Sequence, residues 1–89
     1  MTNGTQYKNW WEVPTKWVAH CDGELAPGGE TLSSAKAEAW KLFGKRGKEV
    51  SVRTEINGAY RGFSKYEGED WRPLWLTDED AAAIIAAED

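Results

Sequence analysis

A chain of 89 residues is long enough for one domain but not for two, and we expect a single domain over residues 1–89. The apolar residues, 40% of the total, never form a run close to the roughly 20 that cross a bilayer, so we expect no transmembrane helix. The net charge of −4 is unevenly spread, because residues 1–66 carry ten basic and seven acidic side chains whereas residues 67–89 carry one and eight.

Residues 1–6 have neither the basic start nor the apolar stretch of a secretory signal peptide. The single cysteine, Cys21, excludes an internal disulfide, which fits a reducing compartment. We therefore expect a cytoplasmic protein with Cys21 as a small buried side chain.

The first strand candidate covers residues 7–21 and is interrupted at Pro14, because proline cannot donate to a sheet ladder. From residue 17 the side chains follow the period-2 pattern of a strand. The turn pair Asp22-Gly23 then leads into a short strand over residues 24–26, which we expect the following Pro-Gly-Gly to end in a loop.

The main helix is predicted over about residues 33–45, where the apolar period changes from 2 to 3.6. Thr31, Ser33 or Ser34 can cap its start, and Gly44 or Gly47 can end it in a left-handed conformation. Its apolar stripe contains Leu32, Ala35, Ala39, Leu42 and Phe43.

The strongest local signal is a β-hairpin over residues 49–66, where apolar and polar residues alternate on the way to Asn57-Gly58, the pair typical of a type I′ turn. A two-residue loop predicts the pairs Ile56 with Ala59, Glu55 with Tyr60, Arg53 with Gly62, Val52 with Phe63 and Glu49 with Tyr66. This register directs inward Val50, Val52, Ile56, Ala59 and Phe63. It directs outward Arg53, Glu55, Tyr60 and Tyr66.

Residues 71–76 are predicted to form another short strand, and Thr77-x-x-Asp80 is a capping-box variant that opens a short C-terminal helix. Leu76 and Ala81 can pack together at its start. The order of elements predicts an α+β domain, in which a small antiparallel sheet that includes the hairpin packs against one main helix.

No catalytic, metal or cofactor site is expected. His20, Cys21 and Asp22 combine a base, a nucleophile and an acid, but neighbours on a strand point to opposite faces, so His20 and Cys21 cannot act as a pair. One histidine and one cysteine cannot supply the three or four ligands of zinc, and the acids lack the spacing of a calcium loop.

Tryptophans and acids supply the candidate contact residues. A small core cannot hide six indoles, so we expect at least three in the core and at least one in a protein interface. The predicted partner-binding residues are Glu67, Glu69, Asp70, Trp71, Trp75, Asp78, Glu79 and Asp80. The secondary candidates are Trp40, Arg53, Tyr60 and Tyr66.

Seven short pieces of residues 15–55 carry a resemblance to a known family: Lys16-Trp17, Glu30-Thr31-Leu32, Ala35, Ala39, Trp40, Glu49-Val50 and Arg53. In these positions the chain resembles the short inhibitor that phage T7 makes against bacterial RNA polymerase, a compact α+β family with one helix on a small sheet. The resemblance implies that Arg53 corresponds to the family's basic strand contacts. The acidic segment after Glu67 has no counterpart in that family.

We therefore expect a non-catalytic protein-binding domain, a small phage-encoded inhibitor of a host protein or nucleoprotein complex, in host takeover or in anti-defence such as the anti-CRISPR class. It would use its acidic and aromatic surface, without a membrane partner. One alternative is a small nucleic-acid-binding domain using the outer hairpin face and the basic residues Lys41, Lys45, Arg46 and Lys48. Another alternative is a self-associating accessory domain, so that the chain would be a monomer or a homodimer.

Overall fold

The computed structural model describes residues 7–56 and 58–88, and the side chains of all of these except residue 88. The expected turn residue Asn57 and the segment 1–6 lie outside this range. The elements are a 3-10 turn η1 (Trp10–Glu12), β1 (Trp17–Cys21), β2 (Glu24–Gly29), α1 (Leu32–Phe43), a 3-10 turn η2 (Gly44–Arg46), β3 (Val50–Ile56), β4 (Ala59–Lys65), β5 (Arg72–Leu74) and α2 (Asp78–Glu88). The α+β fold class is confirmed, and none of these helices is long and apolar enough to span a membrane.

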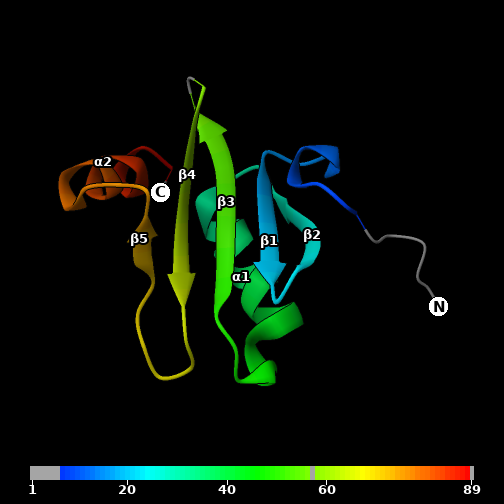
Figure 1. Cartoon of the computed structure of the whole chain (residues 1–89). Helices are drawn as coiled ribbons and strands as arrows, with labels where there is room; N and C mark the ends of the chain where they lie inside the picture. The colour runs from blue at the N-terminus through cyan, green and yellow to red at the C-terminus, as the bar shows by residue number, and fades with distance from the viewer. Residues whose placement is uncertain (1–6, 57, 89) are drawn as a thin grey trace.

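The five strands form one antiparallel sheet in the order β2-β1-β3-β4-β5. Helix α1 lies across one face of this sheet, and α2 lies beside β5 at its edge (Figure 1). Neither α1 nor α2 covers the opposite face, which we call the open face (Figure 1).

The core lies between the sheet and α1. Alternate residues of β1, β3 and β4 point toward the helix, and α1 buries four residues of its predicted apolar stripe against them. The fifth, Leu42, was expected in the stripe but is 45% exposed, because it lies at the edge of the buried face. The buried cluster comprises Trp17, Ala19, Cys21, Leu32, Ala35, Ala39, Phe43, Val50, Val52, Phe63 and Ala81. Trp40 and Trp71 pack against it as half-buried side chains, so three of the six tryptophans contribute to the core as expected.

The hairpin register is confirmed from Ile56↔Ala59 to Val50↔Lys65. The ladder ends there, one pair short of the expected Glu49–Tyr66 pair, because both of these residues lie just outside the strands. Helix α1 also begins as predicted, since the Thr31 hydroxyl accepts a hydrogen bond from the Ser34 backbone N–H at 3.1 Å.

Two expectations in the first third of the chain are wrong. Trp10–Glu12 is a 3-10 turn and not a strand, and its carboxylate at Glu12 accepts hydrogen bonds from the backbone N–H groups of Lys8 and Asn9 at 3.0 Å each. Strand β2 continues through Pro27 to Gly29, where a loop was expected. An edge strand tolerates proline, because one side of its backbone has no ladder partner.

Candidate binding surface on the open face of the sheet

Residues that alternate with the core positions of β1, β3 and β4 lie on the open face. His20 is half-buried there, whereas its neighbour Cys21 is fully buried in the core on the other face. Burial raises the pKa of the Cys21 thiol, which disfavours the reactive thiolate. The structure therefore separates the two members of the only base and nucleophile pair that the sequence offered.

Arg53 is the central charged residue of the open face. Its side chain is half-buried, its Nε donates to the Ser51 hydroxyl at 3.3 Å, and its Nη2 lies 3.4 Å from His20 Nδ1. Burial and then the Arg53 charge lower the pKa of His20, so the imidazole is neutral at pH 7 and can accept from the guanidinium at Nδ1. Burial also lowers the pKa of Arg53, although an arginine keeps its charge at neutral pH.

The Arg53 guanidinium forms no ion pair with a carboxylate among the described residues, in contrast to Arg46, which pairs with Glu24, and Lys48, which pairs with Asp22. Its third contact is aromatic, because the guanidinium lies 5.3 Å from the centre of the Trp75 ring. The direct contacts of this half-buried positive charge are thus a hydroxyl, a neutral imidazole and an indole, and the Glu49 charge acts on it without forming an ion pair.

Trp75 is an exposed side chain on a strained backbone. Its φ of 60° lies in the left-handed region, which is uncommon for a bulky residue, yet 56% of the side chain is exposed to solvent. The ring lies over Gly62 of β4, and a Cβ added there would come within 3.4 Å of the indole and 2.8 Å of the Val52 carbonyl oxygen. Gly62 thus gives the indole room to lie on the sheet.

Replacing Gly62 by alanine is expected to lower the free energy of unfolding by about 1–3 kcal/mol, because the new methyl group must displace either backbone or the indole. Urea denaturation measures this loss, and the Trp75 indole resonance should move with it. Ala59→Gly in the same strand is the control for the difference in backbone preference between alanine and glycine. It is expected to lower the free energy of unfolding by about 0.5–1 kcal/mol. A Gly62→Ala protein more stable than the unmodified chain would contradict this account.

Two further aromatic rings complete a groove on this face. Trp10, from η1, contacts Tyr60 of β4 edge to face, with ring centres 5.0 Å apart. Tyr60 is 53% exposed. The groove has a volume of about 220 Å³ and is lined by Trp10, Arg53, Thr54, Tyr60 and Trp75. We call these five residues the Arg53 groove.

The structure brings together Arg53, Tyr60 and Trp75 among the residues singled out from the sequence. Trp10 was not among the partner-binding candidates, since nothing in its local pattern shows that η1 folds back to β4. The Trp11 ring next to it, with ring centres 6.3 Å apart, is 65% exposed.

The acidic candidates lie in two separate places. Glu67, Glu69 and Asp70 belong to the loop between β4 and β5, whereas Asp78, Glu79 and Asp80 form the first turn of α2, at the other end of β5 (Figure 1). In that turn the Asp80 backbone N–H donates to the Thr77 hydroxyl at 3.1 Å, the cap that the sequence predicted. Acids there also stabilise the positive end of the helix dipole.

The remaining candidates occupy other surroundings. Trp71 packs on Trp40 with ring centres 6.4 Å apart, and the Lys65 ammonium lies 4.6 Å from the centre of the Trp40 ring. Both indoles are therefore half-buried in packing contacts. Tyr66 is 43% exposed just past the end of β4, away from the residues that line the Arg53 groove.

Two cations of the basic run at the end of α1 pair with acids of the β1–β2 hairpin. Lys48 Nζ lies 2.7 Å from Asp22 Oδ2, and Arg46 Nη1 lies 2.8 Å from Glu24 Oε1. Hydrogen bonds from these two cations lower the pKa of the Asp22 and Glu24 carboxyls. Two of the four cations proposed for nucleic acid thus already have carboxylate partners.

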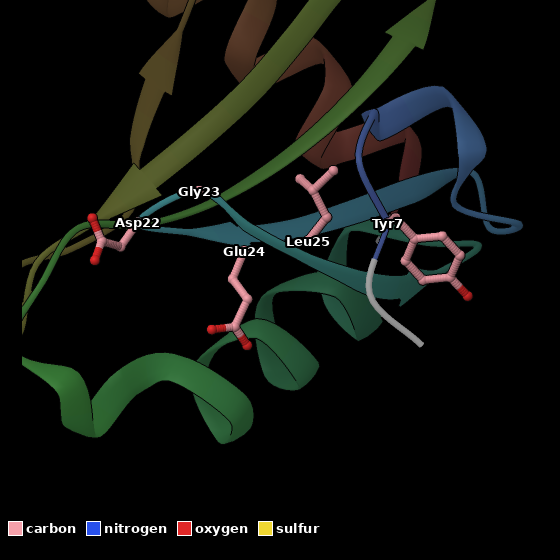
Figure 2. A pocket seen from close by; sticks show the side chains of 5 residues that line it. All are labelled: Tyr7, Asp22, Gly23, Glu24 and Leu25. Atoms are coloured by element: carbon pink, nitrogen blue, oxygen red, sulfur yellow. The ribbon is translucent and has the colours of Figure 1, made fainter. Parts of the chain in front are cut away.

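A second hollow lies at that hairpin, and Figure 2 shows its lining residues, with the Tyr7 ring beside Leu25 and the carboxylates of Asp22 and Glu24 pointing away from them. Since both acids are engaged with cations, this hollow presents no free charged group. It is a weaker candidate than the Arg53 groove.

Comparison with known protein families, with curated proteins and with solved structures found no match to this chain.

Proposed function

We propose that the chain is a non-catalytic protein-binding domain that contacts its partner through the open face of the sheet. The observation that carries this proposal is the Arg53 guanidinium, half-buried without a carboxylate and stacked on an exposed Trp75. Tryptophan, tyrosine and arginine supply most of the strong contacts in protein interfaces. A strained backbone that holds an exposed indole in place is typical of a functional surface.

The finer proposal, suggested by the sequence resemblance, is that the partner is a host macromolecular machine and the chain a phage-encoded inhibitor. The open face supports a protein partner better than a nucleic acid. It has one half-buried cation, whereas nucleic-acid affinity depends on many phosphate contacts. The ion pairs of Arg46 and Lys48 also favour a protein partner over a nucleic acid, because two of the basic residues already have carboxylate partners.

Two exposed tyrosines near opposite ends of β4 provide a matched test. We expect the immobilised full chain to retain a stoichiometric protein from bacterial lysate at low salt. Tyr60→Ser should lose this protein because Tyr60 lines the groove, and Tyr66→Ser should keep it. Circular dichroism of both variants confirms that the fold is retained.

Three results would contradict the proposal. Equal capture by both variants would show that the open face is not the contact surface. If capture is lost only when the acids at 67–70 and 78–80 are neutralised, the acidic segment and not the open face is the contact surface. Capture abolished by nuclease treatment would favour the nucleic-acid alternative.

A further inference from the structure

We infer that the Arg53 groove receives one large apolar side chain from an extended, internal segment of a partner protein, with an aspartate or glutamate of the same segment on the Arg53 guanidinium. This inference rests on the proposed function and specifies what the open face recognises.

The size of the groove points to a single side chain. Pockets for small-molecule ligands and cofactors usually measure about 300–1,000 Å³, and this groove has only about 220 Å³. Its walls are the rings of Trp10, Tyr60 and Trp75. An apolar side chain that fills it loses its contact with water against three aromatic surfaces.

The charge of the groove points to one carboxylate. Among the described residues the direct contacts of the Arg53 guanidinium are uncharged, namely the Ser51 hydroxyl, the neutral His20 ring and the face of Trp75, and Glu49 acts on it without forming an ion pair. A half-buried charge with no carboxylate in direct contact gains most from an anion that a partner brings. A guanidinium fork and a carboxylate match in geometry as well as in charge.

Prolines in both edge strands disfavour the addition of a partner strand to the sheet. In the β1–β2 and β3–β4 hairpins, pairs alternate between hydrogen-bonded and non-hydrogen-bonded positions from the turn outward, which makes Val18↔Pro27 non-hydrogen-bonded and Val52↔Phe63 hydrogen-bonded. Since the backbone groups of Phe63 point to β3, the pair Phe63↔Pro73 with β5 is also non-hydrogen-bonded. The nitrogens of Pro27 and Pro73 therefore face outward, where they remove a donor from each edge. A partner strand is poorly accommodated at either edge, so side-chain contacts on the face must hold the segment.

The position of Arg53 within the sheet favours an internal acid over a chain end. Terminal carboxylates are commonly held by clusters of free backbone N–H groups. Arg53 lies in β3, which pairs with β1 on one side and with β4 on the other, so the surrounding N–H groups belong to the ladders. The groove offers a side-chain cation and no backbone cradle.

Capped tripeptides test the inference with the isotopically labelled full chain. The probe is acetyl-Asp-Leu-Asp-amide, which carries an acid on both sides of the apolar residue, and the readouts are the indole N–H signals of Trp10 and Trp75 and the Arg53 Nε–H signal at low salt. We expect this probe to bind at least roughly fivefold more tightly than acetyl-Asn-Leu-Asn-amide, because a hydrogen bond to a charged group outweighs a neutral one. Acetyl-Asp-Ala-Asp-amide should also bind more weakly, because it lacks the apolar anchor.

Arg53→Met, which keeps an apolar stem, should abolish the preference for the acidic probe. Arg61→Met is the matched control, since Arg61 lies on β4, does not line the groove and donates to the Tyr60 carbonyl oxygen at 3.1 Å. This control should keep the preference. The methyl signals of both variants report whether the core is intact.

Several results would overturn the inference. Equal binding of the acidic and amide probes would show that the groove does not recognise a carboxylate. Equal loss of the preference for the acidic probe in Arg53→Met and Arg61→Met would show that Arg53 is not the residue that binds it. If neither indole signal shifts with any probe at millimolar concentration, the groove is not the binding site for the peptide. If the free acid acetyl-Asn-Leu-Asn binds as tightly as acetyl-Asp-Leu-Asp-amide, the groove recognises the terminal carboxylate of a chain and not an internal acid. In each case Tyr60→Ser could still lose the lysate partner, so the proposed function is tested separately.

Discussion

Replacing Trp17 by alanine is expected to lower the free energy of unfolding by about 3–5 kcal/mol, the usual loss for a large aromatic residue removed from a core. Trp17 is 0% exposed and belongs to the buried cluster between the sheet and α1. For 89 residues at about 0.05–0.15 kcal/mol each, the total stability is roughly 4–13 kcal/mol. The substitution should therefore remove a large part of it, measured by urea denaturation followed by far-ultraviolet circular dichroism.

Two further tryptophan variants separate the causes of this loss. Trp11→Ala is the matched control, because Trp11 is 65% exposed, and its cost should stay within about 0.5 kcal/mol. Trp17→Phe should cost less than Trp17→Ala. It keeps most of the apolar ring and removes the indole N–H, which is buried and lacks a hydrogen-bond partner among the described residues. Equal urea midpoints for Trp17→Ala and Trp11→Ala would contradict the assignment of Trp17 to the core.

Local patterns predicted the elements that local chemistry determines. The hairpin register followed from strict alternation and a two-residue loop, and the start of α1 followed from the Thr31 cap. The extension of β2 through Pro27 could not be predicted in the same way. A Pro-Gly-Gly run ends most strands, and only the place of β2 at the sheet edge makes the proline harmless.

The candidate site could be predicted only in part, because its geometry is tertiary. Arg53 and Tyr60 were placed on the outer face by the hairpin register. The contact of Arg53 with Trp75 depends on a left-handed backbone at Trp75, a conformation that a tryptophan in the sequence does not indicate. Trp10 joined the groove only through the packing of η1 on β4. The charge split was evident in the sequence, as was a strand over residues 71–76 between the two groups of acids; the structure adds that β5 is an edge strand of the sheet.

The location of the acids changes what they are expected to contribute to binding. Six carboxylates in two places cannot form one contact patch, yet their fields add at a distance and can still guide a basic partner. Replacing Glu67, Glu69, Asp70, Asp78, Glu79 and Asp80 by their amides should therefore slow association and flatten its dependence on salt. Dissociation should change little. The loop acids and the helix acids should be neutralised separately as well, since the latter also stabilise α2.

Trp75→Ala is expected to have the opposite kinetic signature. An aromatic anchor in an interface contributes about 2 kcal/mol or more, so its loss should raise the dissociation rate constant about 30-fold while association stays nearly unchanged. Surface plasmon resonance with the captured partner measures both rates, and Tyr66→Ser serves as the exposed aromatic control. A Trp75→Ala protein that dissociates at the unmodified rate would show that the indole over Gly62 fills space on the sheet without touching the partner. In that case the open face would have no aromatic anchor at Trp75, and the Arg53 groove would not be the binding surface.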